Sequence, residues 1–145
     1  MNFDDDYPTC EETSAVLRIF SDEIDPREIT ELLGVEPSSI QIKGERKYPN
    51  RAEYINKENG WFLHSEDNVE SKDLRRHLDW LLSKMNNCHS QLRELASKGA
   101  EITIFCPWRS ASGHGGPTMD PQQMKVLGDL GIEVVFEFWV CDDKE

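Results

Sequence analysis

Four basic side chains fall within nine residues of this otherwise acidic sequence, at Lys43, Arg46, Lys47 and Arg51. The whole chain carries 16 basic and 28 acidic residues, which gives a formal net charge of -12. A local basic cluster binds a carboxylate or phosphate in spite of that charge, because salt screens acids more than about 10 Å away. The segment therefore indicates either an anion site or a solvated loop neutralised by its own glutamates.

Histidine and cysteine side chains raise the question of a metal site. Cys88 and His89 are adjacent, and two helical stretches would have to bring them together with His77. Their spacing matches no standard zinc pattern. His77 precedes Leu78 in an apolar helical stripe, which places it at the margin of the buried face. We therefore expect neither a metal ion nor a cofactor.

A cysteine–histidine nucleophile pair would require Cys106 beside His64 or His114. Residues 101–108 alternate as a strand does, and this pattern places Cys106 on the same face as Ile104. Cys106 is then a small core residue rather than a nucleophile. The sequence shows no serine hydrolase motif either. No catalytic motif therefore favours an enzyme.

The glycine-rich segment from Gly113 to Gly116 precedes a helix, as a phosphate-binding loop would. It lacks the Lys-Ser/Thr pair of a P-loop and does not match the dinucleotide-binding pattern. Asp120 would cap the following helix and place a carboxylate where an anion should bind. We expect a flexible loop.

Aromatic and charged side chains alternate along three strands, at residues 13–20, 101–108 and 132–140. One face, with Leu17, Ile104 and Phe136, should be covered by helices. The opposite face carries Arg18, Phe20, Thr103, Phe105, Glu137 and Trp139. Arg18 and Glu137 would pair if their strands are adjacent. Phe105 and Trp139 should be partly exposed, so this open face is expected to bind a ligand or form a weak homodimer.

The periodicity of the apolar residues and the helix-capping residues predict the elements that position these side chains. Helices are expected from Asp25-Pro26 to Gly34 and from Asp120-Pro121 to Gly131, since each has an N-cap, a proline and a terminal glycine. This repeated capping pattern implies two β-α-β halves, whether they arose by duplication or by convergence. Further strands are expected at 39–43 and 61–64, a long mobile loop at 44–59, and leucine-rich helical stretches between 71 and 99.

The resulting order is β-α-β-β-α-β-α-β. It predicts an α+β fold, a ferredoxin-like two-layer sandwich with a mainly antiparallel sheet and helices on one face. A single domain should span residues 13–141, between an acidic N-terminal arm at 1–12 and an acidic tail at 142–145.

Charge and cysteine usage bound the location and the partners. The net charge of -12 disfavours nucleic acid and anionic membranes, whereas it attracts a cationic protein. No segment is apolar enough to cross a bilayer, and the first residues are acidic where a signal peptide would be basic. Four scattered cysteines favour free thiols. We expect a cytoplasmic protein.

A family resemblance covers residues 13–140. It rests on Leu17-Arg-Ile-Phe20, the Asp25-Pro26 helix, Lys43-Gly44-Glu45, Trp61 and the late Asp-Pro helix before an apolar strand. The sequence resembles small bacterial proteins known only as a domain of unknown function. The resemblance implies the fold and no activity.

Two functional hypotheses remain open. The first is a noncatalytic binding or interaction module that uses the aromatic sheet face and the basic loop to engage a cationic protein. The second is an enzyme or small-ligand receptor with an anion site beside the basic loop, between the sheet and the segments 44–59 and 109–118. The candidate contacts are Arg18, Lys43, Arg46, Trp61, Phe105, Arg109, His114, Glu137 and Trp139.

Overall fold

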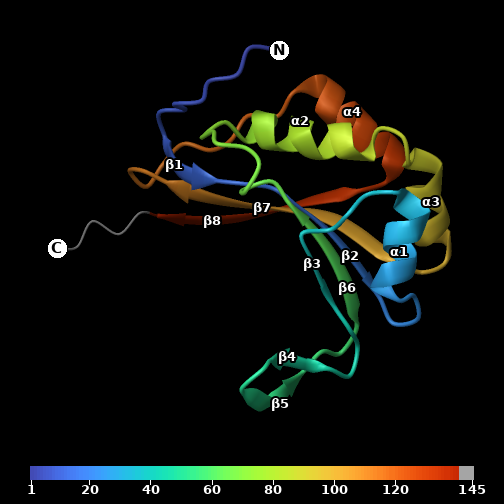
Figure 1. The fold of residues 1–145 in the computed structure, drawn as a ribbon. Coiled ribbons are helices and arrows are strands. Elements are labelled where there is room, and N and C mark those ends of the chain that lie inside the picture. The colour runs from blue at the N-terminus through green and yellow to red at the C-terminus, as the bar shows by residue number, and fades with distance from the viewer. Residues whose placement is uncertain (141–145) are drawn as a thin grey trace.

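The computed structural model describes residues 1–140, which form a mixed α+β fold (Figure 1). The strands are β1 (Cys10–Thr13), β2 (Val16–Ser21), β3 (Ser39–Gln41), β4 (Arg46–Tyr48), β5 (Arg51–Ile55), β6 (Asn59–His64), β7 (Glu101–Ser110) and β8 (Glu133–Val140). The helices are α1 (Pro26–Leu33), α2 (Leu74–Met85), α3 (His89–Ser97) and α4 (Pro121–Leu130). The proposed tail at 142–145 lies outside the described residues.

The main sheet is antiparallel except at one edge. β7 pairs with β2 through its first half and with β1 through its second half, so β1 and β2 share one edge of β7. β6 follows β2, and β3 follows β6. β8 runs parallel to β7 along the other edge. The strand β1 begins at Cys10, inside the segment expected to be a separate arm.

The two helices with capping residues at both ends begin and end where the sequence indicates. The side chains of Asp25 and Asp120 accept hydrogen bonds from the backbone N–H of the second residue of α1 and α4. Gly34 and Gly131 end these helices with φ of 69° and 70°, a left-handed conformation that glycine adopts without strain. Asp73 caps α2 in the same way. The residues between Met85 and His89 separate α2 from α3.

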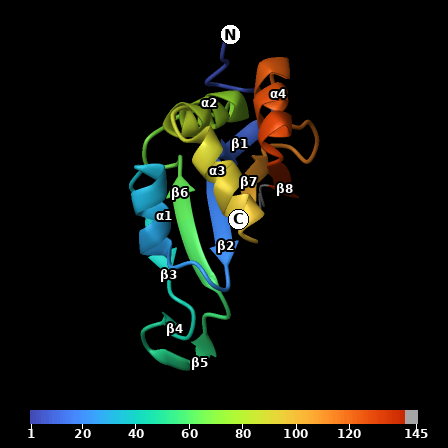
Figure 2. The same ribbon diagram turned by 90° about the vertical axis from the view of Figure 1, so that its right-hand side faces the viewer.

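All four helices cover the same face of the sheet (Figures 1 and 2). Leu17, Ile19 and Ile104 point into the core beneath them and are fully buried. Phe136 was expected in the same core, but it is only partly buried and stacks on Phe138 with ring centres 5.7 Å apart. Because β8 is the edge strand, the helical layer covers it incompletely.

The prediction of a mobile loop at 44–59 is wrong. This segment forms the two-stranded hairpin β4–β5, which projects from the body of the protein (Figure 1). Tyr48 pairs with Arg51 across the turn, and the rings of Tyr48 and Tyr54 meet edge to face at 5.7 Å. All residues of both strands are exposed, so the apolar alternation that marks a buried strand is missing.

None of the helices in the part of the chain that the structure describes is long and apolar enough to span a membrane.

Candidate functional site

A groove of about 940 Å³ lies on the open face of the sheet, between the sheet and the β4–β5 hairpin. Its floor follows β2, because every second residue from Ser14 to Phe20 faces it. The other walls come from β6, β7 and the hairpin. The lining residues used below are Ser14, Val16, Arg18, Phe20, Lys47, Glu53, Tyr54, Ile55, Asn56, Lys57, Glu58, Phe62, Glu66, Phe105 and Pro107. We call this surface the groove.

Arg18 occupies the middle of the groove floor. Its guanidinium carbon lies 4.6 Å from the centre of the Phe105 ring and 5.8 Å from that of Phe20. Its Nε donates one long hydrogen bond of 3.4 Å to the hydroxyl of Thr103. The condition for its pairing with Glu137 is not met, because β7 lies between β2 and β8. Within residues 1–140, Arg18 makes no ion pair.

Phe62 is the aromatic neighbour of Arg18 on β6, directly opposite it in register. Its ring meets that of Phe20 edge to face at 5.5 Å. The ring also lies against Gly60, where an added Cβ would be only 2.6 Å from Cζ of Phe62. The absence of a side chain at Gly60 therefore gives the Phe62 ring the space that it occupies in the groove lining.

The hairpin supplies one wall of the groove, which carries both apolar and charged side chains. Tyr54 and Ile55 are each 45% exposed, and they face the groove beside Lys47. Asn56, at the base of the hairpin, is 7% exposed, and its Nδ2 donates to the carbonyl of Ile42. Its Oδ1 is buried and has no donor among the described residues. A buried amide oxygen without a partner costs about 1–3 kcal/mol, so this oxygen lowers the stability of the hairpin base.

A second depression of about 580 Å³ adjoins the groove. Its acidic lining residues are Asp5, Asp6, Glu11, Glu12, Glu66 and Glu70, and Lys72 is its basic one. Ser14, Glu66 and Pro107 line both depressions. We call the second depression the acidic hollow; together with the groove it makes one continuous surface.

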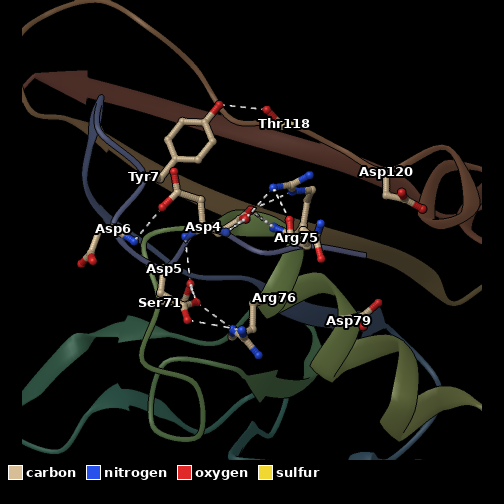
Figure 3. A network of polar contacts seen from close by, with 12 residues as sticks. Asp4, Asp5, Asp6, Tyr7, Ser71, Arg75, Arg76, Asp79, Thr118 and Asp120 are labelled. Atoms are coloured by element: carbon tan, nitrogen blue, oxygen red, sulfur yellow. Dashed lines mark hydrogen bonds and ion pairs between the residues drawn. The ribbon is translucent and has the colours of Figure 1, made fainter.

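The N-terminal segment contributes Asp5 and Asp6 to the lining of the acidic hollow, and Figure 3 shows its polar contacts with the start of α2. Oδ1 of Asp5 lies 2.7 Å from Nε of Arg76 and accepts a 2.6 Å hydrogen bond from the Ser71 hydroxyl. These two hydrogen bonds lower the pKa of Asp5. The backbone N–H of Asp4 donates to Oδ2 of Asp73 at 2.7 Å. The segment is therefore fixed to the start of α2 and keeps a charged carboxylate at the wall.

His77 and Ser65 form a buried pair beside the acidic hollow. Nε2 of His77 donates to the carbonyl of Ser71 at 2.8 Å, so Nδ1 accepts from the Ser65 hydroxyl at 2.7 Å. The backbone N–H of Ala15 donates to the same hydroxyl oxygen. Burial lowers the pKa of His77. Ser65 is 0% exposed, so this pair links structural elements and cannot reach a substrate.

Of the residues proposed from the sequence, Arg18 and Phe105 line the groove together. Trp61 does not, because it is 0% exposed and its indole N–H donates to Thr30 beneath α1. Since strand side chains alternate, a buried Trp61 turns Phe62 toward the groove. That alternation was the available signal for Phe62, which the sequence interpretation missed. Tyr54 and Glu66 had no such signal.

Lys43 and Arg46 lie near the hairpin but do not line the groove. Nζ of Lys43 is 3.8 Å from a carboxylate oxygen of Asp22, and Arg46 donates to the carbonyl of Pro49. Lys47 is the member of the basic cluster that faces the groove. The cluster therefore does not converge on one anion.

The other four proposed residues lie toward the far end of β7 and β8, outside the groove. Arg109 pairs with Glu12 at 3.4 Å, and His114 lies in the following loop, where its carbonyl accepts from Ser110. Glu137 is exposed on β8. Trp139 is 38% exposed and Phe105 is partly exposed, as expected for the open face. The structure thus separates these four from Arg18.

Cys10, Cys88 and Cys106 are free and buried, whereas Cys141 lies outside the described residues. Burial raises the pKa of Cys10 to about 11 and that of Cys106 to about 12, so both thiols are protonated at neutral pH. Cys106 is 0% exposed in the core, as its strand position predicts. Among residues 1–140, no three histidine, cysteine or acidic side chains are grouped as metal ligands.

Comparison with known proteins gives a family. No curated protein and no solved structure matches the chain. Residues 11–141 match the model of a family described as a domain of unknown function (DUF4279), and the chain therefore belongs to this family.

Proposed function

We propose that this chain is a noncatalytic binding module that holds an extended segment of a cationic protein partner. The segment lies along β2, with apolar side chains in the groove and basic side chains in the acidic hollow. Main-chain groups of the partner face the hairpin wall, beside Tyr54 and Ile55. Recognition of extended peptides on exposed strands and grooves commonly combines such main-chain and side-chain contacts.

The junction between the groove and the acidic hollow carries this proposal. Because Ser14, Glu66 and Pro107 line both, one chain can lie on both without leaving the surface. On one side of the junction, apolar side chains of the partner contact Phe20 and Phe62. On the other side, its basic side chains contact carboxylates.

Charge supports a cationic partner in particular. The formal net charge of -12 attracts such a partner over long range, and the acidic hollow gives the attraction a local target. Glu66 and Glu70 are exposed and make no ion pair with any described residue. Their charge is therefore available to a partner.

A second candidate is an enzyme or a small-ligand receptor with an anion site beside the hairpin, and the unpaired guanidinium of Arg18 favours it. A small-ligand site normally encloses most of its ligand. The groove is instead partly open to solvent and follows β2 from Ser14 to Phe20. This shape suits a segment of protein better than a small molecule.

We also propose that the core of the fold is ferredoxin-like and that the protein is cytoplasmic. The order β7-β2-β6-β3, with every neighbouring pair antiparallel, supports the ferredoxin-like interpretation. The helix α4 and the strand β8 are then additions at one edge. Free buried thiols at Cys10, Cys88 and Cys106 support a reducing compartment.

Selection from a library of random dodecapeptides on the immobilised protein tests the proposed function. We expect the enriched peptides to combine lysine or arginine with apolar residues, and their binding to weaken as salt is raised to about 0.5 M. The double variant Glu66→Gln/Glu70→Gln should lose the preference for basic residues. The absence of basic residues from the peptides that the wild type enriches would contradict the proposal.

Glu23→Gln/Glu31→Gln is the matched control. It removes the same charge from two exposed acids that do not line the groove or the acidic hollow. If long-range attraction alone selects basic peptides, both double variants lose the preference equally. If the acidic hollow is the contact, only the first does.

A further inference from the structure

Arg18 is unusual on this acidic surface because its charge is not neutralised by an ion pair with any described residue. Acidic residues outnumber basic ones by 28 to 16, yet no carboxylate of residues 1–140 forms an ion pair with its guanidinium. Its only hydrogen bond uses Nε, which leaves both terminal NH₂ groups free of protein partners in the described part of the chain. The rings of Phe20 and Phe105 hold it in place. A fixed guanidinium with free NH₂ groups is suited to bidentate binding of an anion.

The distance between Arg18 and the acidic hollow follows from the sequence positions along the groove floor. Ser14, at the junction, and Arg18 are four residues apart on the floor of the groove. At a rise of about 3.3 Å per residue, this separation is about 13 Å. An extended partner segment lying alongside covers the same distance with about four of its own residues.

We propose that the partner segment carries an acidic side chain that binds Arg18 and, about four residues away, a basic side chain that enters the acidic hollow. Apolar residues between them contact Val16 and Phe62. This inference rests on the proposed function and specifies its partner. The segment is thus cationic overall and carries one required carboxylate.

The surroundings of Arg18 favour a single carboxylate over a phosphate. Glu53, Glu58 and Glu66 in the groove lining offset the charges of Arg18, Lys47 and Lys57, so the lining offers no surplus positive charge for a dianionic group. The groove also continues on both sides of Arg18, toward Tyr54 and toward Pro107. A bound chain therefore runs past Arg18, and the carboxylate belongs to a side chain rather than to a chain terminus.

A double-mutant cycle tests the inference on a peptide enriched from the dodecapeptide library by the wild-type protein. One change is Arg18→Gln in the protein, and the other replaces the peptide's acidic residue by its amide. We expect each single change to weaken binding by about tenfold or more, since one charge-assisted pair is lost. The two changes together should weaken it no further than either one.

Two controls separate the charge of Arg18 from its geometry and from general effects. Arg18→Lys retains the charge without the bidentate fork and should remain weaker than the wild type. Arg93→Gln removes an exposed arginine of α3, which lies in the helical layer and does not line the groove, and should leave the affinity unchanged. Thermal unfolding of each variant checks that the fold is intact.

The outcomes distinguish this inference from the proposed function. Enriched peptides that contain basic but no acidic residues would overturn the role of Arg18 and leave the binding module standing. The same holds if the effects of the two changes simply multiply. Enrichment without basic residues would instead contradict the proposed function itself.

Discussion

The ring of Phe62 lies against the backbone of Gly60, and a Cβ at position 60 would stand 2.6 Å from Cζ of Phe62 and 2.8 Å from Cγ of Gln41. Gly60→Ala must therefore displace the ring from the groove floor. We expect a loss of about 1–3 kcal/mol in the free energy of unfolding, the usual range for overpacking, and weaker binding of groove ligands. Urea unfolding monitored by tryptophan fluorescence measures the first effect.

The same substitution in a Phe62→Ala background gives the control. Without the ring, two of the three nearest atoms are gone, and the third is Cγ of the flexible Gln41 side chain. We expect Gly60→Ala to cost much less there, so the two changes are coupled. Equal costs in both backgrounds would show that the contact with Phe62 is unimportant.

His77 makes stability depend on pH in a defined window. Burial lowers its pKa below the ordinary value of 6.5, against the opposing hydrogen bond to Ser71 and the carboxylates of Asp73, Asp5 and Glu66. The unfolded chain therefore binds more protons than the fold between the two pKa values. Stability from this group is complete above pH 6.5 and falls as pH drops through 6.5 toward the folded pKa.

Urea unfolding at several pH values between about 7 and 5 measures this effect. Asp5 and Asp73 also have lowered pKa values, but they lose their stabilising charge only at more acidic pH. His77→Gln should flatten the dependence between pH 7 and 5, at whatever cost to stability overall. An unchanged slope in this variant would assign the dependence to other groups.

Asp73 should be more important to stability than the other helix-capping aspartates. Burial raises its pKa, but hydrogen bonds from the side chain of Arg75 and the backbone of Asp4 outweigh this and lower it. Its side chain is 0% exposed and also caps α2. We expect Asp73→Ala to cost about 2–4 kcal/mol and to release the N-terminal segment to proteases. Asp25→Ala, at an exposed cap, should cost clearly less, and equal losses would contradict this.

Trp139 tests whether the edge strand β8 associates with a second copy. Trp139 is 38% exposed, Phe138 58% and Val140 57%, and exposed apolar edge strands tend to pair. We expect weak homodimerisation by sedimentation equilibrium, reduced by Trp139→Ser, with stability changed by less than about 0.5 kcal/mol. A dimer of undiminished affinity in the variant would place the interface elsewhere.

Elements whose signals are local were predictable from the sequence. Asp25-Pro26 with Gly34, and Asp120-Pro121 with Gly131, identify two helices because capping depends on neighbouring residues alone. Alternation likewise placed Arg18 and Phe105 on one face and Cys106 in the core. These features need no knowledge of distant contacts.

Features that depend on chain pairing were not predictable in this way. β4 and β5 are exposed throughout and mostly polar, so no apolar alternation marks them as strands. The acidic strand β1 was missed because it pairs with residues far away in the sequence, such as Cys10 with Ser110. The groove needs both β2 and this hairpin, and the acidic hollow needs the N-terminal segment. The sequence therefore identifies Arg18 as a candidate residue but does not predict the groove and the acidic hollow around it.

Amide hydrogen exchange of the protein with and without an enriched dodecapeptide tests the location of the binding surface most directly. The hairpin β4–β5 has only two short exposed strands, so its amides should exchange fast in the free protein. If the partner segment lies along β2 in the groove, exchange in Arg46–Tyr48 and Arg51–Ile55 slows on binding, while α1 and α4 are unchanged. Slowed exchange along β8 or the helices, with the hairpin unaffected, would contradict the groove as the binding site.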